Sequence, residues 1–137
     1  MLKAYLSHPI RGHLKDKATT QDMKRNCEWA IEMAELIRTF VPTVLELYVP
    51  AEHEEFVDRA HKMGFLTIEQ ILSVDCDIMH KYSDVLLVFA PFGPPVKGCR
   101  VEMQHAYSHD IPVIIFETFG ELVEKLTPFL KHRGLVE

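Results

Sequence analysis

The sequence predicts an α/β fold: a doubly wound parallel sheet of four to five strands, in the order 2-1-3-4, with helices on both faces. Four short runs rich in Val, Ile, Leu and Tyr show little alternation of polar and apolar residues, which is typical of parallel strands buried on both faces. Stretches with helical periodicity separate these runs. We therefore expect residues 1–137 to form one domain of this class.

The first expected elements are strands over residues 3–7 and 43–48, joined by a long helix over residues 20–40. Apolar residues recur on one stripe of this helix, and Thr19 or Thr20 is a suitable N-cap. The stripe consists of Met23, Cys27, Ala30, Ile31, Ala34 and Ile37.

The remaining elements are expected as helices over residues 52–63, 67–81, 101–109 and 119–131 and strands over residues 84–90 and 111–116. Asp75 interrupts the apolar stripe of the second of these helices, and Asp77 lies beside that stripe. Asp84 is expected at the amino end of its strand, as a turn or capping residue.

Composition excludes several classes of protein. With 47% hydrophobic and 26% charged residues, the chain has the balance of an ordinary globular protein. Its net charge of -5 argues against a protein that binds polymeric nucleic acid. It contains no apolar run long enough to span a membrane, so we expect a cytoplasmic protein without a membrane partner. Its three cysteines have no metal or redox spacing and are expected to be free thiols.

The predicted strand order brings distant segments together. Strands 1 and 3 are neighbours whose following helices cover opposite faces, and open α/β sheets bind ligands in the crevice at such a point. A loop rich in proline and glycine, residues 91–98, follows the third strand directly. We therefore expect Arg11, after the first strand, to face residues 97–102 across this crevice.

Residues 97–102 contain Lys97, Gly98 and Arg100 at the expected start of a helix, where backbone N–H groups and the helix dipole favour an anion. The alternative is a solvated basic turn. Glu102 is expected in the first turn of that helix, where glutamates are commonly surface residues that the dipole stabilises.

Glu102, His105 and His109 have a spacing that places three potential metal ligands on one helix face. No partner cluster accompanies them in the sequence, so we expect neither a metal nor a cofactor, and a metal hydrolase is only a third hypothesis. The other histidines have no partner pattern and are expected at the surface: His53, His61, His80 and His132.

Three segments in order resemble the nucleoside 2-deoxyribosyltransferase-like superfamily, and are nearest to its deoxynucleoside 5'-monophosphate N-glycosidases. They are residues 5–12 (YLSHPIRG), 77–84 (DIMHKYSD) and 97–106 (KGCRVEMQHA). The resemblance implies that Glu102 is the nucleophile at the anomeric carbon, that Asp77 gives a proton to the leaving base, and that Tyr5 orients the nucleophile. Two carboxylates about 5 Å apart suit a retaining route of this kind.

The resemblance also implies a 5'-phosphate site in the loop after the first strand, at Pro9, Ile10, Arg11 and Gly12, facing Lys97, Gly98 and Arg100. Val96 departs from the family, which has a serine or aspartate six residues before the nucleophile. Lys97 or Arg100 is a candidate to replace that serine as a phosphate partner. His8 stands where relatives often have a small residue, and the sequence does not explain it.

The leading hypothesis is therefore an N-glycosidase that hydrolyses the base–sugar bond of a nucleoside 5'-monophosphate. The alternatives are a non-catalytic domain that binds or senses nucleotides, and a nucleoside deoxyribosyltransferase. The expected partner is a small nucleotide or nucleoside, and the resemblance implies a homo-dimer or higher homo-oligomer.

Overall fold

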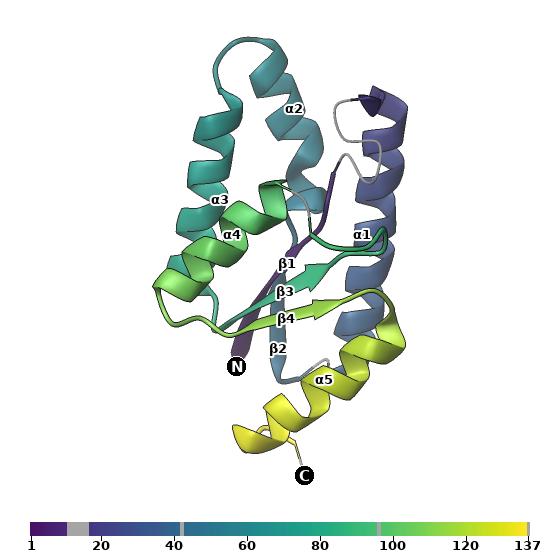
Figure 1. Ribbon diagram of the computed structural model, residues 1–137, viewed down its shortest axis with the longest axis vertical. Coiled ribbons are helices and arrows are strands. Elements are labelled where there is room, and N and C mark those ends of the chain that lie inside the picture. Colours follow the sequence, from purple (N-terminus) through teal and green to yellow (C-terminus); the bar gives the residue numbers. More distant parts are fainter. Residues whose placement is uncertain (11–16, 42, 96, 137) are drawn as a thin grey trace.

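The computed structural model describes residues 1–10, 17–41, 43–95 and 97–136, except for the side chain of Lys97. Its four strands form one parallel sheet in the order β2-β1-β3-β4. The strands are β1 (Leu2–Ser7), β2 (Leu45–Tyr48), β3 (Val85–Phe89) and β4 (Val113–Phe116). The predicted class, strand order and coverage of both faces are confirmed (Figure 1).

Three strands begin later than the sequence predicts: β2 at Leu45, β3 at Val85 and β4 at Val113. Asp84 Oδ2 accepts a hydrogen bond of 2.8 Å from the backbone N–H of Lys3, at the amino end of β1. The backbone N–H of Ile111 instead donates to the carbonyl of Ala106. Asp84 thus lies at the end of the sheet opposite the predicted crevice, as expected.

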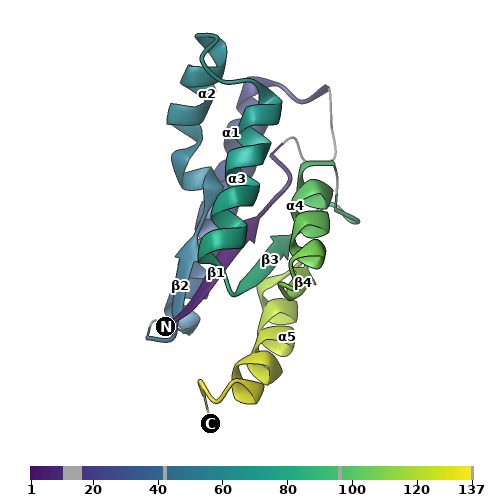
Figure 2. The same ribbon diagram turned by 90° about the vertical axis from the view of Figure 1, so that its left-hand side faces the viewer.

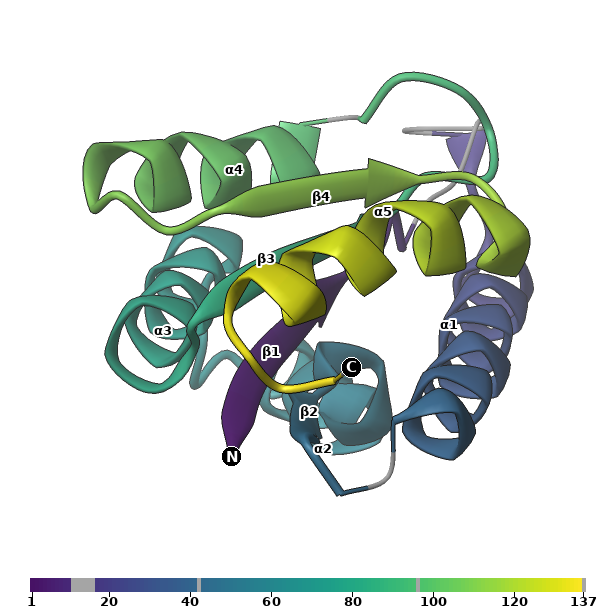
Figure 3. The ribbon, with the colours of Figure 1, turned by 90° about the horizontal axis from the view of Figure 1, so that it is seen from below.

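One face of the sheet is covered by α1 (Thr20–Phe40) and α5 (Phe119–His132), as Figure 3 shows. Thr19 caps α1 by accepting from the backbone N–H of Asp22, whose side chain accepts in return. The apolar side chains of α1 and α5 pack against alternate residues of β1. The β1 residues in this core are Leu2, Ala4 and Leu6.

The opposite face is covered by α3 (Ile68–Tyr82) and α4 (Lys97–Ser108), which lie side by side (Figure 2). Tyr5, the β1 residue between Ala4 and Leu6, points to this face. Thr67 caps α3 in the same way as Thr19 caps α1. The two helices therefore enclose a second core, which contains Tyr5, Met79, Cys99 and Ala106.

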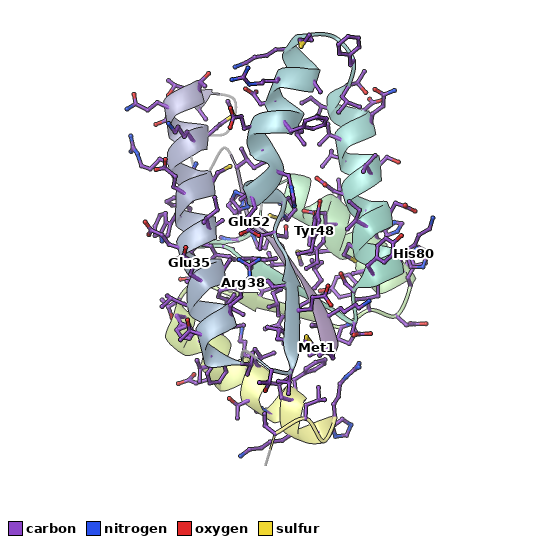
Figure 4. All side chains as sticks on the ribbon, turned by 180° about the vertical axis from the view of Figure 1, so that it is seen from behind. Met1, Glu35, Arg38, Tyr48, Glu52 and His80 are labelled. Carbon is purple, nitrogen blue, oxygen red and sulfur yellow. The ribbon has the colours of Figure 1, made fainter. Side chains whose placement is uncertain are left out.

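The predicted helix over residues 52–63 is two shorter elements, the 3-10 helix η2 (Pro50–His53) and α2 (Glu54–Lys62). Arg38 of α1 binds η2 through two hydrogen bonds to Glu52, at 2.7 and 2.9 Å (Figure 4). It also donates to the carbonyl of Leu47 in β2. No residue of α2 is buried.

The start of α4 corrects the predicted boundary. The helix begins at Lys97 rather than at residue 101, so Glu102 lies in its second turn and not in its first. In the described part of the chain, no helix is long and apolar enough to cross a membrane. All three cysteines are free, as predicted, and all are buried.

Candidate functional site

Glu102 is a buried carboxylate at the carboxyl end of β1. Its side chain projects from α4, and the residue is 7% exposed. Ser7, the last residue of β1, donates a hydrogen bond of 2.7 Å from its Oγ to Glu102 Oε1, and the same Oγ lies 3.2 Å from Cys99 Sγ. The contact joins residues 95 positions apart. It lies where the first strand meets the segment after the third, as predicted.

Tyr5 lies on the same face of β1 as Ser7, because side chains two apart in a strand point the same way. It is fully buried and stacks on Tyr48, with ring centroids 5.6 Å apart. Burial, together with the nearby charge of Glu102, raises the pKa of the Tyr5 phenol well above its usual value. The hydroxyl is near Glu102 but makes no hydrogen bond of good geometry within the described chain, so Ser7 is the direct partner of the carboxylate.

Asp75 of α3 is a second, half-buried carboxylate facing this group. Burial raises its pKa to about 6, against a smaller opposing effect of His53. The Asp75 carboxylate in turn raises the pKa values of Tyr5, Tyr48 and Glu102. Asp75 is therefore close enough to Glu102, Tyr5 and Tyr48 for its charge to act on them.

Asp77 projects from a different side of α3. Two residues correspond to about 200° around a helix, so Asp75 and Asp77 point in nearly opposite directions. Asp77 is exposed, pairs with Lys81 at 3.3 Å, and lines a groove between α3 and α4. Its predicted role as the acid stays a prediction, but Asp75 is the aspartate of α3 that faces Glu102.

The pKa of Glu102 is about 7. Burial raises it most, the Tyr5 and Ser7 hydroxyls lower it, and the Asp75 charge raises it. With pKa values near 6 and 7, the two carboxyl groups together hold about one proton between about pH 6 and pH 7. One group is then ionised while the other is an acid, and because Asp75 has the lower pKa, the form with Glu102 ionised and Asp75 protonated is the less populated of the two.

The raised pKa of Glu102 has a consequence for stability. We expect Glu102→Gln to raise the free energy of unfolding at about pH 8, but to change it little at about pH 4. The carboxyl has a pKa of 4.5 when unperturbed and about 7 in the folded protein, so the unfolded chain loses this proton first. Stability of the wild type therefore falls between these two pH values, and the glutamine variant escapes this loss.

Because one unit of pKa difference corresponds to about 1.4 kcal/mol, the gain at high pH is at most roughly 3 kcal/mol. Urea unfolding of both proteins across this pH range measures it. A stability difference that does not grow with pH would contradict the assignment of a raised pKa to Glu102.

The predicted phosphate site is described only in part. Arg11 and Gly12 lie outside the described residues, as do Val96 and the side chain of Lys97. Asn26 of α1 donates a hydrogen bond of 2.8 Å to the carbonyl of Ile10, which ties the start of the loop to α1, and Pro9 beside it is buried.

The first turn of α4 contains Gly98 and Arg100, two residues of the predicted phosphate site. The backbone at Gly98 is open, since an added Cβ would meet no heavy atom within 4 Å among the described residues. Arg100 is exposed and donates from Nε to the carbonyl of Pro95 at 3.2 Å. The phosphate role of these residues stays a prediction.

His8, which the sequence does not explain, is a buried neutral imidazole. Burial lowers its pKa to about 4, and its Nε2 has no hydrogen-bond partner in the described part of the chain. It lines a small pocket with Pro9, Trp29 and Phe92. The residue packs beneath the start of the loop after β1 on the side of α1.

Sequence reasoning missed three residues near the candidate site. Ser7 has the strand spacing that places it beside Tyr5, and Asp75 shows itself as a charge within an apolar stripe. His80 was expected at the surface without a partner, but it packs against His105 and His109. No local pattern in the sequence marks His80, because its neighbours His105 and His109 belong to a later segment of the chain.

No family model, curated protein or solved structure matches the chain. The arrangement is a Rossmann-like α/β fold with the buried Glu102 carboxylate at the carboxyl end of β1.

Proposed function

We propose that the protein is an N-glycosidase that hydrolyses the base–sugar bond of a nucleoside 5'-monophosphate, with Glu102 as the nucleophile. The observation that carries this proposal is the buried Glu102 carboxylate held by Ser7, with the Asp75 carboxyl facing it. An N-glycosidic bond breaks through a transition state with positive charge on the anomeric carbon, so a fixed carboxylate stabilises or captures it. The departing base needs a proton, which the second carboxyl supplies.

The reaction has two steps. In the first, an oxygen of Glu102 bonds to the anomeric carbon, the C–N bond breaks, and its electron pair leaves with the base, which takes a proton from the acid. In the second, water attacks the same carbon, gives its proton to the acid residue, and displaces the Glu102 carboxylate. The products are the free base and the sugar 5'-phosphate.

We assign the acid role to Asp75, with Asp77 as the alternative that the family resemblance implies. The support for Asp75 is its half-buried position on α3 and its electrostatic effect on Glu102. Asp77 is exposed and paired with Lys81. Tyr5 and Ser7 act as positioning residues for the nucleophile.

The 5'-phosphate is proposed to bind between the loop after β1 and the first turn of α4. The open backbone at Gly98 supports this position, since unpaired N–H groups at a helix N-terminus bind phosphate. Pro9, Ile10, Arg11 and Gly12 would form the other side, with Lys97 and Arg100 as cations near the anion.

A panel of ribo- and deoxyribonucleoside 5'-monophosphates tests the proposal, with free base measured by chromatography. Release of one base in equal amount to sugar 5'-phosphate is the expected result. Release that requires a second base as acceptor would identify a deoxyribosyltransferase instead. Thermal stabilisation by a nucleotide without turnover would identify a binding or sensing domain, because a ligand of the folded state raises its stability. The absence of both turnover and binding would overturn all three functions.

We also propose that the protein acts as a homo-dimer or higher homo-oligomer, with α2 and the start of α3 in the interface. The support is a set of largely exposed apolar side chains around the turn between these helices: Phe56, Met63, Phe65 and Ile68. Light scattering is expected to give at least twice the mass of the chain. Phe65→Asp should yield monomers, whereas Tyr107→Asp, on exposed α4 surface, should not; a monomeric wild type would contradict the proposal.

A further inference from the structure

Three histidines from two helices gather on the outer side of the α3–α4 pair. His80 lies near the C-terminal end of α3, at the edge of the molecule (Figure 4), His105 is on α4, and His109 is in the turn that follows α4. Their ring centroids are separated by 3.8 Å for His80 and His109, 4.3 Å for His105 and His109, and 5.5 Å for His80 and His105. This group is called the histidine cluster below.

The geometry of the histidine cluster is close to that of a metal site. One ring nitrogen from each residue lies within 4.8 Å of the others. In a tetrahedral zinc site with Zn–N bonds of about 2.1 Å, the ligand atoms lie about 3.4 Å apart. His80 and His109 are exposed, so small rotations of their side chains suffice to bring the three nitrogens to this separation.

Two hydrogen-bonding details orient the rings for a metal. His109 Nδ1 lies 2.8 Å from the backbone carbonyl of His105, and a carbonyl only accepts, so Nδ1 is the donor and Nε2 is the nitrogen that remains for a metal. A second ring nitrogen bonded to a carbonyl is the usual support of a metal-binding histidine. His105 Nε2 is shielded from solvent and has no hydrogen-bond partner among the described residues.

The surroundings leave room for a fourth ligand. A groove of about 480 Å³ runs between α3 and α4 and is lined by His80, His105 and the carboxylate residue Asp77. Asp77 lies one turn before His80 on α3 and acts electrostatically on His105. The fourth position can therefore be filled by water or by this carboxylate, both of which complete three-histidine sites.

We propose that His80, His105 and His109 form a binding site for a divalent transition metal such as Zn²⁺, with a fourth coordination position that opens onto the groove between α3 and α4. Three imidazoles favour Zn²⁺, Ni²⁺ or Cu²⁺ over Mg²⁺ and Ca²⁺, which prefer oxygen ligands. The site crosslinks α3 to α4. It is distinct from the Glu102 and Asp75 pair and does not depend on the proposed glycosidase function.

Isothermal titration calorimetry, with ZnCl₂ added to chelator-treated protein, tests the site directly. We expect saturable binding of one Zn²⁺ per chain, no comparable binding of Mg²⁺, and an increase in thermal stability with Zn²⁺ concentration. His80→Asn removes one ligand and is expected to weaken binding at least about tenfold. The matched control His132→Asn, an exposed histidine of α5, should bind as the wild type does.

Co²⁺ supplies a second readout, because its visible spectrum is intense when the ion is four-coordinate and weak when it is six-coordinate. The intense spectrum is expected for the wild type and for Glu102→Gln, and its loss for His80→Asn and His105→Asn. The proposal is overturned if Zn²⁺ does not saturate at one ion per chain, or if His80→Asn and His132→Asn weaken binding equally. Neither readout measures base release. A protein that binds no metal could therefore still be an N-glycosidase, and a protein that releases no base could still bind the metal.

Discussion

Glu102→Gln is expected to lower the rate of base release by about 10³-fold or more, because loss of the nucleophile removes the covalent route. Glutamine has nearly the same shape as glutamate, and its carbonyl oxygen can still accept the hydrogen bond from Ser7. It cannot supply a negative charge to the developing cation at the anomeric carbon. Single-turnover measurements with the preferred nucleotide would show the loss in the chemical step.

Because its shape and its hydrogen bond from Ser7 are retained, Glu102→Gln is expected to keep the fold. At high pH it is expected to be more stable than the wild type. Loss of activity together with gain of stability is a combination that simple misfolding cannot produce. Glu124→Gln, an exposed glutamate of α5, is the matched control and should retain full activity. A rate for Glu102→Gln close to that of the control would remove Glu102 from the nucleophile role.

Asp75→Asn is expected to lower kcat by about 10²-fold or more, whereas Asp77→Asn should leave it nearly unchanged. Asparagine retains the shape of aspartate but carries no acidic proton for the departing base. Only Asp75 is half-buried against the Glu102 group, while Asp77 is exposed and paired with Lys81. Steady-state kinetics of the two variants, made two residues apart in one helix, compare the candidate acids directly.

A substrate whose leaving group needs no proton separates acid catalysis from a structural effect. With such a substrate, Asp75→Asn should recover much of its lost rate, since the missing proton is no longer required. The wild type should show a bell-shaped pH profile with its maximum between about pH 6 and 7, where the carboxyl pair holds one proton. A large loss for Asp77→Asn with little for Asp75→Asn would return the acid role to Asp77.

Most of the fold follows from local patterns. The helix predicted over residues 20–40 is α1 itself, because the Thr19 cap and the apolar stripe are both local features. The strand order also follows, since four short buried runs separated by helices leave few parallel arrangements. The predicted start of α4 was wrong by four residues. Residues 97–100 include cations and a glycine, and these residue types do not indicate a helix.

The candidate site follows from the sequence less completely. Glu102 and Tyr5 were singled out, and they lie together as the resemblance implies. Ser7 and Asp75 were passed over, although strand alternation and an interrupted stripe mark them. Which of two aspartates in a helix faces the sheet depends on the rotation of that helix, and packing against Met79 and its neighbours decides this rotation.

The sequence by itself determined the class of fold, the strand order and the presence of a carboxylate after the third strand. Hydrophobic periodicity and capping act over a few residues, so they can be read without the rest of the chain. Only the tertiary structure decided that Ser7 holds Glu102, that Asp75 faces it, and that His80 joins His105 and His109. These pairings join residues from 25 to 95 positions apart, and they arise because sheet pairing and helix packing bring distant segments within a few ångströms.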